Sequence, residues 1–323
     1  MAQVSYIQAI NQALDEEMAR DPLTFVMGED VVLAAFGATR GLFKKYGPNR
    51  VRNTPIAEAG FVGAAVGAAM AGTRPICEVE FASFFYCAMD QVCNQAAKLR
   101  YMSGGQARLP ITFRCVYGAA GGAAAQHSET VYAQFLSVPG LKLAMPSSPS
   151  DAKGMLKSAI RDDNPVIVFE HLALGRLREE IPAGDHLVPL GKAAIKRPGD
   201  NVTLIAIGAM VPKALKVAEK LAADGVSVEV IDPRTLIPLD EDAILTSIGK
   251  TNRVVIADEG HLRGGAAADL VALIVEKGFD LLDAPPKRVT ALDVPIPFSP
   301  PLEKAALPDE ARIEAAVREL AGH

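Results

Sequence analysis

The chain has no tryptophan and few other aromatic residues. Phe, Trp and Tyr make up 6% of its 323 residues, whereas the hydrophobic set makes up 50% and charged residues 22%. This composition is typical of globular proteins and excludes a disordered or collagen-like chain. A core must therefore be built mainly from Ala, Val, Leu and Ile. The 27 Gly and 22 Pro mark many short connections, and the length favours two domains of the α/β class.

The sequence also lacks a long apolar run and a strong charge of one sign. Its longest apolar stretch, residues 59–72, is shorter than the roughly 20 residues that span a bilayer. The first ten residues show neither a signal-peptide pattern nor an Arg-rich amphipathic leader. The formal net charge is −5, and basic residues form no arm. We therefore expect a cytoplasmic protein that binds neither a membrane nor nucleic acid.

Cysteine and histidine are scarce. The four cysteines, Cys77, Cys87, Cys93 and Cys115, are too few for a disulfide scaffold and have no metal-ligand spacing. The five histidines are scattered along the chain. We expect buried free thiols and no Cys/His metal site.

The common catalytic signatures are missing as well. The sequence contains no G-x-S-x-G, no P-loop, no H-E-x-x-H and no G-x-G-x-x-G after its first strand. These absences argue against a simple hydrolase, an NTPase and a dinucleotide-dependent dehydrogenase.

Expected helices and strands alternate along the chain. In the first half we expect helices at residues 5–20 and 89–102, a helix opened by Ser148 and Asp151, and strands at 24–27, 75–81, 111–116 and 166–170. In the second half, strands at 202–208, 227–232, 253–258 and 288–293 alternate with helices at 212–223, 240–248 and 264–277. Such alternation predicts two mostly parallel, helix-covered sheets, in domains at residues 1–188 and 189–323.

A helix rich in small residues is the least ordinary segment. It is expected to begin near Pro55, and its interior glycines would each cost roughly 1 kcal/mol relative to Ala. Gly63 and Gly67, with Gly60 and Ala71 in the same row, form a smooth stripe that lets another backbone approach closely. A subunit interface and close packing within one domain both explain this stripe.

Four polar residues are candidates for chemistry. Glu29 and Asp30 follow the strand at residues 24–27, where carboxylates face either a ligand crevice or solvent. Glu58 lies in the first turn of the small-residue helix, where the helix dipole favours a carboxylate. His127 follows the Gly/Ala-rich loop of residues 118–125, and its structural alternative is a histidine that binds backbone at a helix entry.

Seven motifs in one order resemble a known family. They are Thr-Pro-Ile-Ala-Glu-Ala-Gly-Phe at residues 54–61, the Gly/Ala helix that follows, Met-Asp-Gln at 89–91, Tyr-Met-Ser-Gly-Gly-Gln at 101–106, Ala-Gln-His-Ser at 125–128, Pro-Gly-Leu-Lys at 139–142 and Asp-Pro-Arg-Thr-Leu at 232–236. Over almost its whole length the chain resembles the beta subunit of the thiamine-diphosphate-dependent decarboxylating component of 2-oxo acid dehydrogenase complexes.

The resemblance implies a transketolase-like pyrimidine-binding domain followed by a transketolase C-terminal domain. It also implies a heterotetramer of two alpha and two beta chains, with thiamine diphosphate at their interfaces and Mg²⁺ held mainly by the alpha chain. The sequence has no Gly-Asp-Gly followed some 25 to 30 residues later by Asn, the diphosphate signature of thiamine enzymes, which agrees with that division. The acyl product would pass to the lipoyl group of a partner acyltransferase.

The resemblance assigns roles to particular residues. Glu58 matches the acid that hydrogen-bonds the aminopyrimidine ring of the cofactor, and His127 matches the active-site histidine. Ile56 and Phe84 match positions that line the aminopyrimidine. A potassium site in relatives matches five further residues, Ile111, Ala159, Ile160, Asp162 and Asn164.

Several alternatives stay open at this point. Pyruvate, branched 2-oxo acids and acetoin are all candidate substrates, because much of the substrate pocket would belong to the alpha chain. A catalytically silent scaffold subunit and a transketolase-like sugar-phosphate enzyme are the other two functions, although Glu58 and His127 together argue against a silent subunit.

Overall fold

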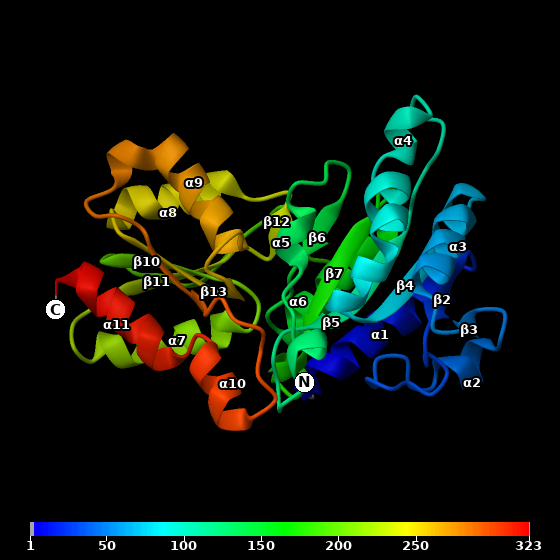
Figure 1. Ribbon diagram of the computed structural model, residues 1–323, viewed down its shortest axis with the longest axis horizontal. Coiled ribbons are helices and arrows are strands. Elements are labelled where there is room, and N and C mark those ends of the chain that lie inside the picture. The colour runs from blue at the N-terminus through cyan, green and yellow to red at the C-terminus, as the bar shows by residue number, and fades with distance from the viewer. Residues whose placement is uncertain (1–2, 323) are drawn as a thin grey trace. The chain divides into compact units, whose positions relative to one another are not determined.

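The chain forms two compact units. The computed structural model describes residues 3–322 (Figure 1). Residues 3–117 and 134–190 form the first unit, and residues 118–133 and 191–322 form the second. The main division at Leu190 lies two residues beyond the position expected from the sequence. The assignment of Gly118–Ala133 to the second unit was not indicated by the sequence.

A parallel sheet forms the centre of the first unit. Six strands lie in the order β6-β7-β5-β4-β2-β3, and every neighbouring pair is parallel. Their bounds are β2 (Thr24–Gly28), β3 (Val51–Asn53), β4 (Arg74–Phe81), β5 (Thr112–Tyr117), β6 (Lys142–Ala144) and β7 (Val166–His171). A separate antiparallel pair joins β1 (Gln3–Ser5) to β8 (Arg178–Glu180). Strands buried on both faces explain the nearly continuous apolar runs of β2 and β7.

Helices cover this sheet. Helix α1 (Tyr6–Arg20) packs on α6 (Pro149–Arg161), and α3 (Glu58–Met70) packs on β4. Both Ser5 and Ser148 cap their helices as the sequence predicts, by accepting hydrogen bonds from Gln8 and Asp151 main-chain N–H groups. The shorter helical elements are α2 (Leu42–Tyr46), η1 (Ala82–Ala88), η2 (Asp90–Ala96), α4 (Leu99–Met102), α5 (Tyr132–Phe135) and η4 (Leu172–Leu174).

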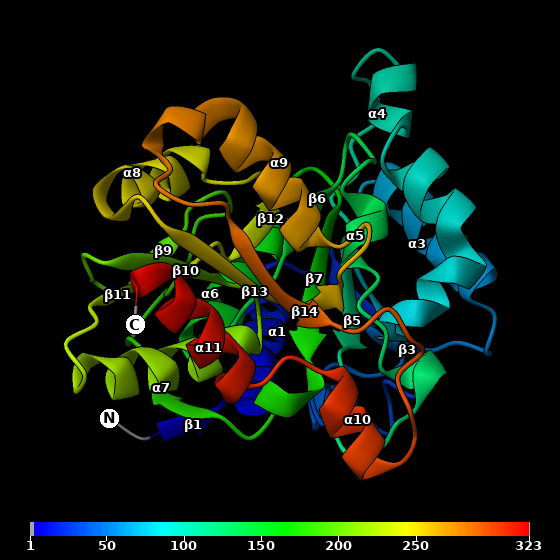
Figure 2. The ribbon, with the colours of Figure 1, turned by 60° about the vertical axis from the view of Figure 1, so that its left-hand side comes forward.

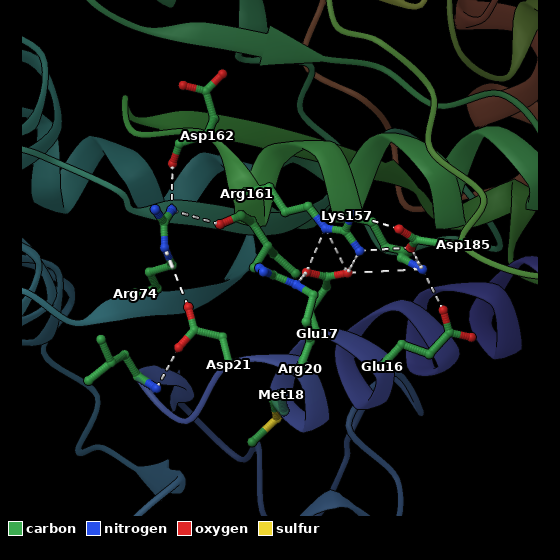
Figure 3. A network of polar contacts seen from close by, with 12 residues as sticks. Glu16, Glu17, Met18, Arg20, Asp21, Arg74, Lys157, Arg161, Asp162 and Asp185 are labelled. Carbon is green, nitrogen blue, oxygen red and sulfur yellow. Dashed lines mark hydrogen bonds and ion pairs between the residues drawn. The ribbon is translucent and has the colours of Figure 1, made fainter.

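Ion pairs join α1 to α6. The Glu17 carboxylate is fully buried and accepts hydrogen bonds from Arg161, with 2.7 Å between Nη2 and Oε1 (Figure 3). Lys157 pairs with Glu16 at 2.6 Å and with Asp185 at 2.7 Å. Because Glu17 is shielded from water, its pairing fixes the two helices against each other more firmly than exposed pairs would.

Two helices differ from the sequence expectation. The single helix expected at residues 89–102 is instead the π-helix η2 followed by α4, and the Ala97 N–H donates to the Val92 carbonyl five residues earlier. The helix expected to begin near Pro55 begins at Glu58. The Thr54 N–H bonds to the Gly28 carbonyl, which continues the pairing of β3 with β2 and delays the helix start.

The second unit is built on a five-stranded sheet in the order β14-β13-β10-β11-β9. Its strands are β9 (Ala194–Arg197), β10 (Val202–Ala206), β11 (Val228–Asp232), β13 (Val254–His261) and β14 (Lys287–Ala291), and only the edge strand β9 is antiparallel to its neighbour. Two further short elements are β12 (Thr235–Ile237) and η5 (Phe279–Leu281).

Helices lie on both faces of the second sheet. Figure 2 shows α7 (Met210–Ala222) beside α11 (Glu310–Ala321) on one face, and α8 (Glu241–Thr251) beside α9 (Ala266–Gly278) on the other. The expected α/β alternation is confirmed here. Helix α11 and the short α10 (Pro300–Ala306) were not expected from the sequence.

The cysteines are free thiols, but not all are buried. Cys77 and Cys115 are buried, Cys93 is half-buried, and Cys87 is exposed, so the expectation of four buried thiols is wrong for Cys87 and Cys93. Burial raises the pKa of Cys77 and Cys115, which keeps both thiols protonated and unreactive.

Candidate active site

Carboxylates gather where β2 and β4 end. Glu29 follows β2, Glu80 is the penultimate residue of β4, and Glu58 opens α3. A close backbone approach makes this possible, because Gly28 has φ +154° and a Cβ there would lie 2.3 Å from the Glu78 carbonyl oxygen. Only glycine fits at that position. The carboxyl ends of the parallel strands thus place acidic side chains at one edge of the sheet.

Glu29 is the most perturbed of these acids. Its side chain is 7% exposed and accepts a hydrogen bond from the Ala57 N–H, at the residue that precedes α3. Burial raises the pKa of Glu29 to about 7, with smaller contributions from the negative charges of Glu58, Glu80 and Asp30. The pKa of Glu80 is raised by the same two causes, burial first. The sequence left Glu29 open between crevice and solvent, and the structure shows that it is buried and not on a solvated turn.

Two buried oxygens at this edge have no hydrogen-bond partner. They are Oε1 of Glu29 and Oγ1 of Thr54, four residues before Glu58. Unpaired buried acceptors are costly and are typical of sites that bind a ligand with hydrogen-bond donors. Glu58 itself is half-buried.

Apolar side chains occur in the same segments: Ile56 lies between Thr54 and Glu58, and Phe84 follows the end of β4. Ile56 is 84% exposed, although an isoleucine is usually buried. Phe84 is half-buried on η1, and its ring packs edge-to-face on Phe81 with 5.5 Å between the ring centroids. Unpaired acceptors, an exposed aliphatic residue and an aromatic ring in adjoining segments fit a flat heterocycle that donates hydrogen bonds, as an aminopyrimidine does.

The other predicted catalytic residue lies in the second unit. His127 ends the 3₁₀ turn η3 (Ala125–His127) within the segment Gly118–Ala133, and it is half-buried. The next residue, Ser128, is buried, and its hydroxyl has no hydrogen-bond partner. Glu58 and His127 therefore belong to different units.

The five residues matched to a potassium site lie in the first unit, at the end of α6 and the start of β5. The main-chain carbonyls of Ile160 and Asp162 accept hydrogen bonds from Arg74, at 3.2 and 3.0 Å (Figure 3). The Asp162 carboxylate pairs with Lys142 and accepts from the Asn164 main-chain N–H at 2.9 Å. The cation that these two carbonyls bind in this structure is the Arg74 guanidinium. It uses one of the two lone pairs on each carbonyl oxygen, and the other lone pair is left.

The described residues show no other metal-binding arrangement. Among residues 3–322, no group of three or more His, Cys, Asp and Glu side chains is placed to hold a metal ion. No helix in the same range is long and apolar enough to cross a bilayer.

Burial of Glu29 gives a testable dependence of stability on pH. Its pKa is about 7 in the folded chain and 4.5 for an ordinary Glu, so its contribution to stability is complete below pH 4.5 and is lost as the pH rises to about 7. We expect Glu29→Gln to flatten the unfolding free energy of the isolated chain across this window. The slope removed is at most that of one proton, about 1.4 kcal/mol per pH unit.

Urea unfolding of both proteins at several pH values measures this effect. The matched control is Glu276→Gln, at an exposed position of α9, and it should leave the slope unchanged. Identical pH profiles for Glu29→Gln and the parent chain would show that Glu29 ionises in the folded chain as freely as in the unfolded one.

Two family models match the chain over the two halves of this architecture. The first is described as the transketolase pyrimidine binding domain and covers residues 2–176. The second is described as the transketolase C-terminal domain and covers residues 191–313. A solved structure with a TM-score of 0.81 and 25% identity, covering 99% of this chain and 98% of its own, is titled a split gene transketolase, inactive beta4 tetramer.

Proteins with similar sequences narrow the class of transketolase-like protein to which the chain belongs. The chain is 48% identical to the acetoin:2,6-dichlorophenolindophenol oxidoreductase subunit beta of Bacillus subtilis, covering 99% of this chain and 97% of the relative. It is 45% identical to the 2-oxoisovalerate dehydrogenase subunit beta of the same organism, covering 99% of each. It is 46% identical to the pyruvate dehydrogenase E1 component subunit beta of Rickettsia felis, covering 98% of each. The chain belongs to the transketolase-like family of dehydrogenase beta subunits, which confirms the resemblance seen in its sequence.

Proposed function

We propose that this chain is the beta subunit of a thiamine-diphosphate-dependent 2-oxo acid or acetoin dehydrogenase. Together with an alpha chain it would cleave the substrate oxidatively and pass the acyl group to the lipoyl group of a partner acyltransferase. The observation that carries the proposal is the edge of the first sheet, where the charge of Glu58 acts on the buried Glu29 and where Oε1 of Glu29 and Oγ1 of Thr54 have no hydrogen-bond partner. The similarity to dehydrogenase beta subunits over nearly the full length supports it.

When bound, thiamine diphosphate supplies the nucleophilic carbon that takes up the substrate and the electrons released on cleavage. The chain's own task is to hold the aminopyrimidine and to move a proton. In this proposal the Glu58 carboxyl shares a proton with a ring nitrogen of the aminopyrimidine, which is general acid–base catalysis. Ile56 and Phe84 hold the flat ring and exclude water from that proton.

Glu29 supports Glu58 indirectly. Its carboxylate binds the Ala57 N–H directly before α3, so it fixes the turn that presents Glu58. Its raised pKa keeps part of the Glu29 population neutral near pH 7, which limits repulsion between the two carboxylates.

In this proposal His127 acts after Glu58, on the bound substrate or on the lipoyl group. An imidazole is charged or neutral near neutral pH, so it can protonate or orient an oxygen or sulfur atom of the substrate or the lipoyl group.

The proposed assembly has two alpha and two beta chains, with Mg²⁺ held mainly by the alpha chain and the cofactor shared. The solved structure that this chain resembles is titled a split gene transketolase, inactive beta4 tetramer, which agrees with a beta chain that is inactive by itself. We accordingly propose that this chain alone binds thiamine diphosphate poorly. Tight, Mg²⁺-dependent binding to the isolated chain in a calorimetric titration would contradict this.

A cytoplasmic location is part of the same proposal, and fractionation of cells tests it.

Potassium is proposed at the turn formed by Ile111, Ala159, Ile160, Asp162 and Asn164. A bound ion would use the lone pairs that Arg74 leaves free at Ile160 and Asp162. Because an ion that binds only the folded chain raises its stability, the unfolding temperature should be higher in KCl than in NaCl or choline chloride at equal ionic strength. Equal temperatures in all three salts would exclude the site.

The exposed row of α3 is the proposed contact with another chain. A Cβ at Gly67 would meet no atom within 4 Å, whereas one at Gly63 would meet Cγ of Gln91 at 3.4 Å. Gly60 and Ala64 are exposed in the same row as Gly67. Packing within the first unit therefore accounts for a small residue at position 63 but not at position 67. Gly67 is the better position at which to test an interface.

We expect Gly67→Leu to weaken assembly without unfolding the chain. Replacement of a helical glycine by leucine stabilises the helix by up to about 1 kcal/mol, so the isolated chain should melt at the same temperature or higher. Association with the alpha chain should fall at least about tenfold, because the added side chain separates the two backbones. Light scattering of dilute mixtures measures this, with Gly67→Ala as the small-residue control. Unchanged assembly of Gly67→Leu would remove the row from the interface.

One assay tests the function and its alternatives. The chain is mixed with candidate alpha subunits, thiamine diphosphate and Mg²⁺, and CO₂ release and dye reduction are followed with pyruvate, branched 2-oxo acids, acetoin and sugar phosphates. Turnover of a 2-oxo acid or acetoin supports the proposal. Turnover of sugar phosphates alone identifies a transketolase-like enzyme, and equal turnover with and without this chain identifies a scaffold.

A further inference from the structure

Carboxylates bind the loop that carries His127 at both of its ends. The loop, residues 118–131, leaves the end of β5 and leads to Tyr132. Gly118, Gly121 and Gly122 have positive φ, as does Ala124 at +63°, where an L-residue is strained. Residues 118–125, the first arm of the loop, are all Gly or Ala, so their side chains offer no hydrogen bond that could fix this arm. Contacts from outside the loop must do so.

The first contact is made by Glu259. This residue lies near the end of β13, is 5% exposed and accepts a hydrogen bond from the Ala119 N–H at 2.7 Å. Ala119 is itself buried, at 7% exposure. A buried carboxylate that accepts a main-chain N–H makes a short, charge-assisted bond, which is stronger than a neutral one.

The second contact is made by Glu303 of α10. Its carboxylate accepts a hydrogen bond from the Gly122 N–H at 2.9 Å, and Glu303 is 8% exposed. Gly122 has φ +78°, and a Cβ there would lie 3.0 Å from the Phe298 carbonyl oxygen. The loop therefore lies directly against the segment that leads into α10, five residues before His127.

The far end of the loop is held by a third acid. The Tyr132 hydroxyl donates to the Asp258 carboxylate, which also accepts the N–H groups of Gly260, at 3.0 Å, and Ala267, at 3.2 Å. Asp258 is fully buried and also organises the start of α9, so it belongs to the framework of the second unit. His127 thus lies between anchors at residues 119 and 122 on one side and at residue 132 on the other.

We propose that Glu259 and Glu303 are positioning residues for His127. Their two carboxylates bind the first arm of the loop to β13 and α10, and this fixes where η3 presents the imidazole. The role given to His127 rests on the proposed function, whereas the anchoring of the loop does not. Neither glutamate touches substrate or cofactor in this proposal.

Amide hydrogen exchange in the isolated full-length chain tests the anchoring directly. In Glu259→Ala the Ala119 amide, and in Glu303→Ala the Gly122 amide, should exchange at least about tenfold faster than in the parent chain. Glu259→Gln and Glu303→Gln keep an acceptor oxygen and should stay within about threefold of the parent. The control Glu276→Ala, at an exposed position of α9, should change nothing.

Two results would overturn the anchoring. One is an unchanged exchange rate across residues 118–128 in both alanine variants. The other is an equal acceleration throughout the second unit, which would show that the glutamates support its fold and not the loop. Exchange in β11, which is buried and is separated from β13 by β10 in the sheet order, serves as the internal reference.

Activity of the assembled enzyme tests the positioning. Acyl transfer to lipoamide should fall about tenfold in Glu259→Ala and Glu303→Ala through kcat, with KM for the 2-oxo acid nearly unchanged, and both glutamine variants should restore it. Acyl transfer that stays unchanged while the loop exchanges faster would overturn the positioning role. If His127→Ala also leaves acyl transfer intact, the function proposed for His127 fails while the exchange result for the loop remains.

Discussion

Replacement of Glu58 by Gln should lower every activity of the assembled enzyme together, by about 10²- to 10⁴-fold. Glutamine has nearly the shape of glutamate, but its side-chain amide acts as neither an acid nor a base at neutral pH. The substitution therefore removes the proton transfer and keeps the packing at the start of α3. Steady-state rates with a 2-oxo acid, measured by dye reduction and by acyl transfer to lipoamide, should fall by the same factor.

Controls separate chemistry from assembly in this experiment. The mass of the complex and the unfolding temperature of Glu58→Gln should match those of the parent, because Glu58 is half-buried and lies in the first turn of α3. Activity within about threefold of the parent would show that another group performs the proton transfer. A loss confined to acyl transfer would place Glu58 at the later step.

The second large effect concerns stability. Arg114 on β5 is 2% exposed and lies between two buried carboxylates, with 2.5 Å from Nη1 to Glu78 and 2.7 Å from Nε to Glu170. Glu78 pairs with Arg114 in the register of β4 and β5, and Glu170 lies on the neighbouring strand β7. Both glutamates raise the pKa of Arg114 although burial lowers it, so the guanidinium stays charged.

We expect Arg114→Met to destabilise the isolated chain by about 3 to 5 kcal/mol, because it leaves two uncompensated carboxylates in the core. Restoring neutrality with Glu78→Gln and Glu170→Gln in the same chain should recover a large part of this loss. Lys220→Met is the matched control, since Lys220 is 65% exposed and its ion pair with Glu314 contributes little. Urea unfolding measures all three. A loss below about 1 kcal/mol for Arg114→Met would show that the strands hold together without this ion triad.

The sequence predicted the regular elements well because the signals for them are local. Ser5 and Ser148 cap their helices within three residues, and the apolar strands of the second unit follow one another at regular intervals. The helix start at Glu58 was misplaced because the Thr54 N–H binds Gly28, a contact between segments 26 residues apart. The break between η2 and α4 has no signal in the sequence that we can name.

The site was only partly predictable. Motifs predicted Glu58, His127, Ile56 and Phe84, but Glu29 gains its raised pKa from burial, from the charges of Glu58 and Glu80 on two other segments and from the adjacent Asp30. Burial and charges on other segments are revealed by no local pattern. The anchoring of the His127 loop was equally hidden. Ala119 and Glu259 are 140 positions apart, and Gly122 and Glu303 are 181 positions apart. Contacts at such separation follow from the packing of the second unit alone.

Hydrogen–deuterium exchange at the thiazolium carbon of thiamine diphosphate, in the reconstituted enzyme without substrate, tests the division of roles between Glu58 and His127 most directly. Glu58→Gln should slow this exchange by about 10²- to 10⁴-fold, because the proton transfer precedes substrate binding. His127→Ala should leave the exchange nearly unchanged and lower only acyl transfer to lipoamide. An equal loss of exchange in both variants would contradict the division.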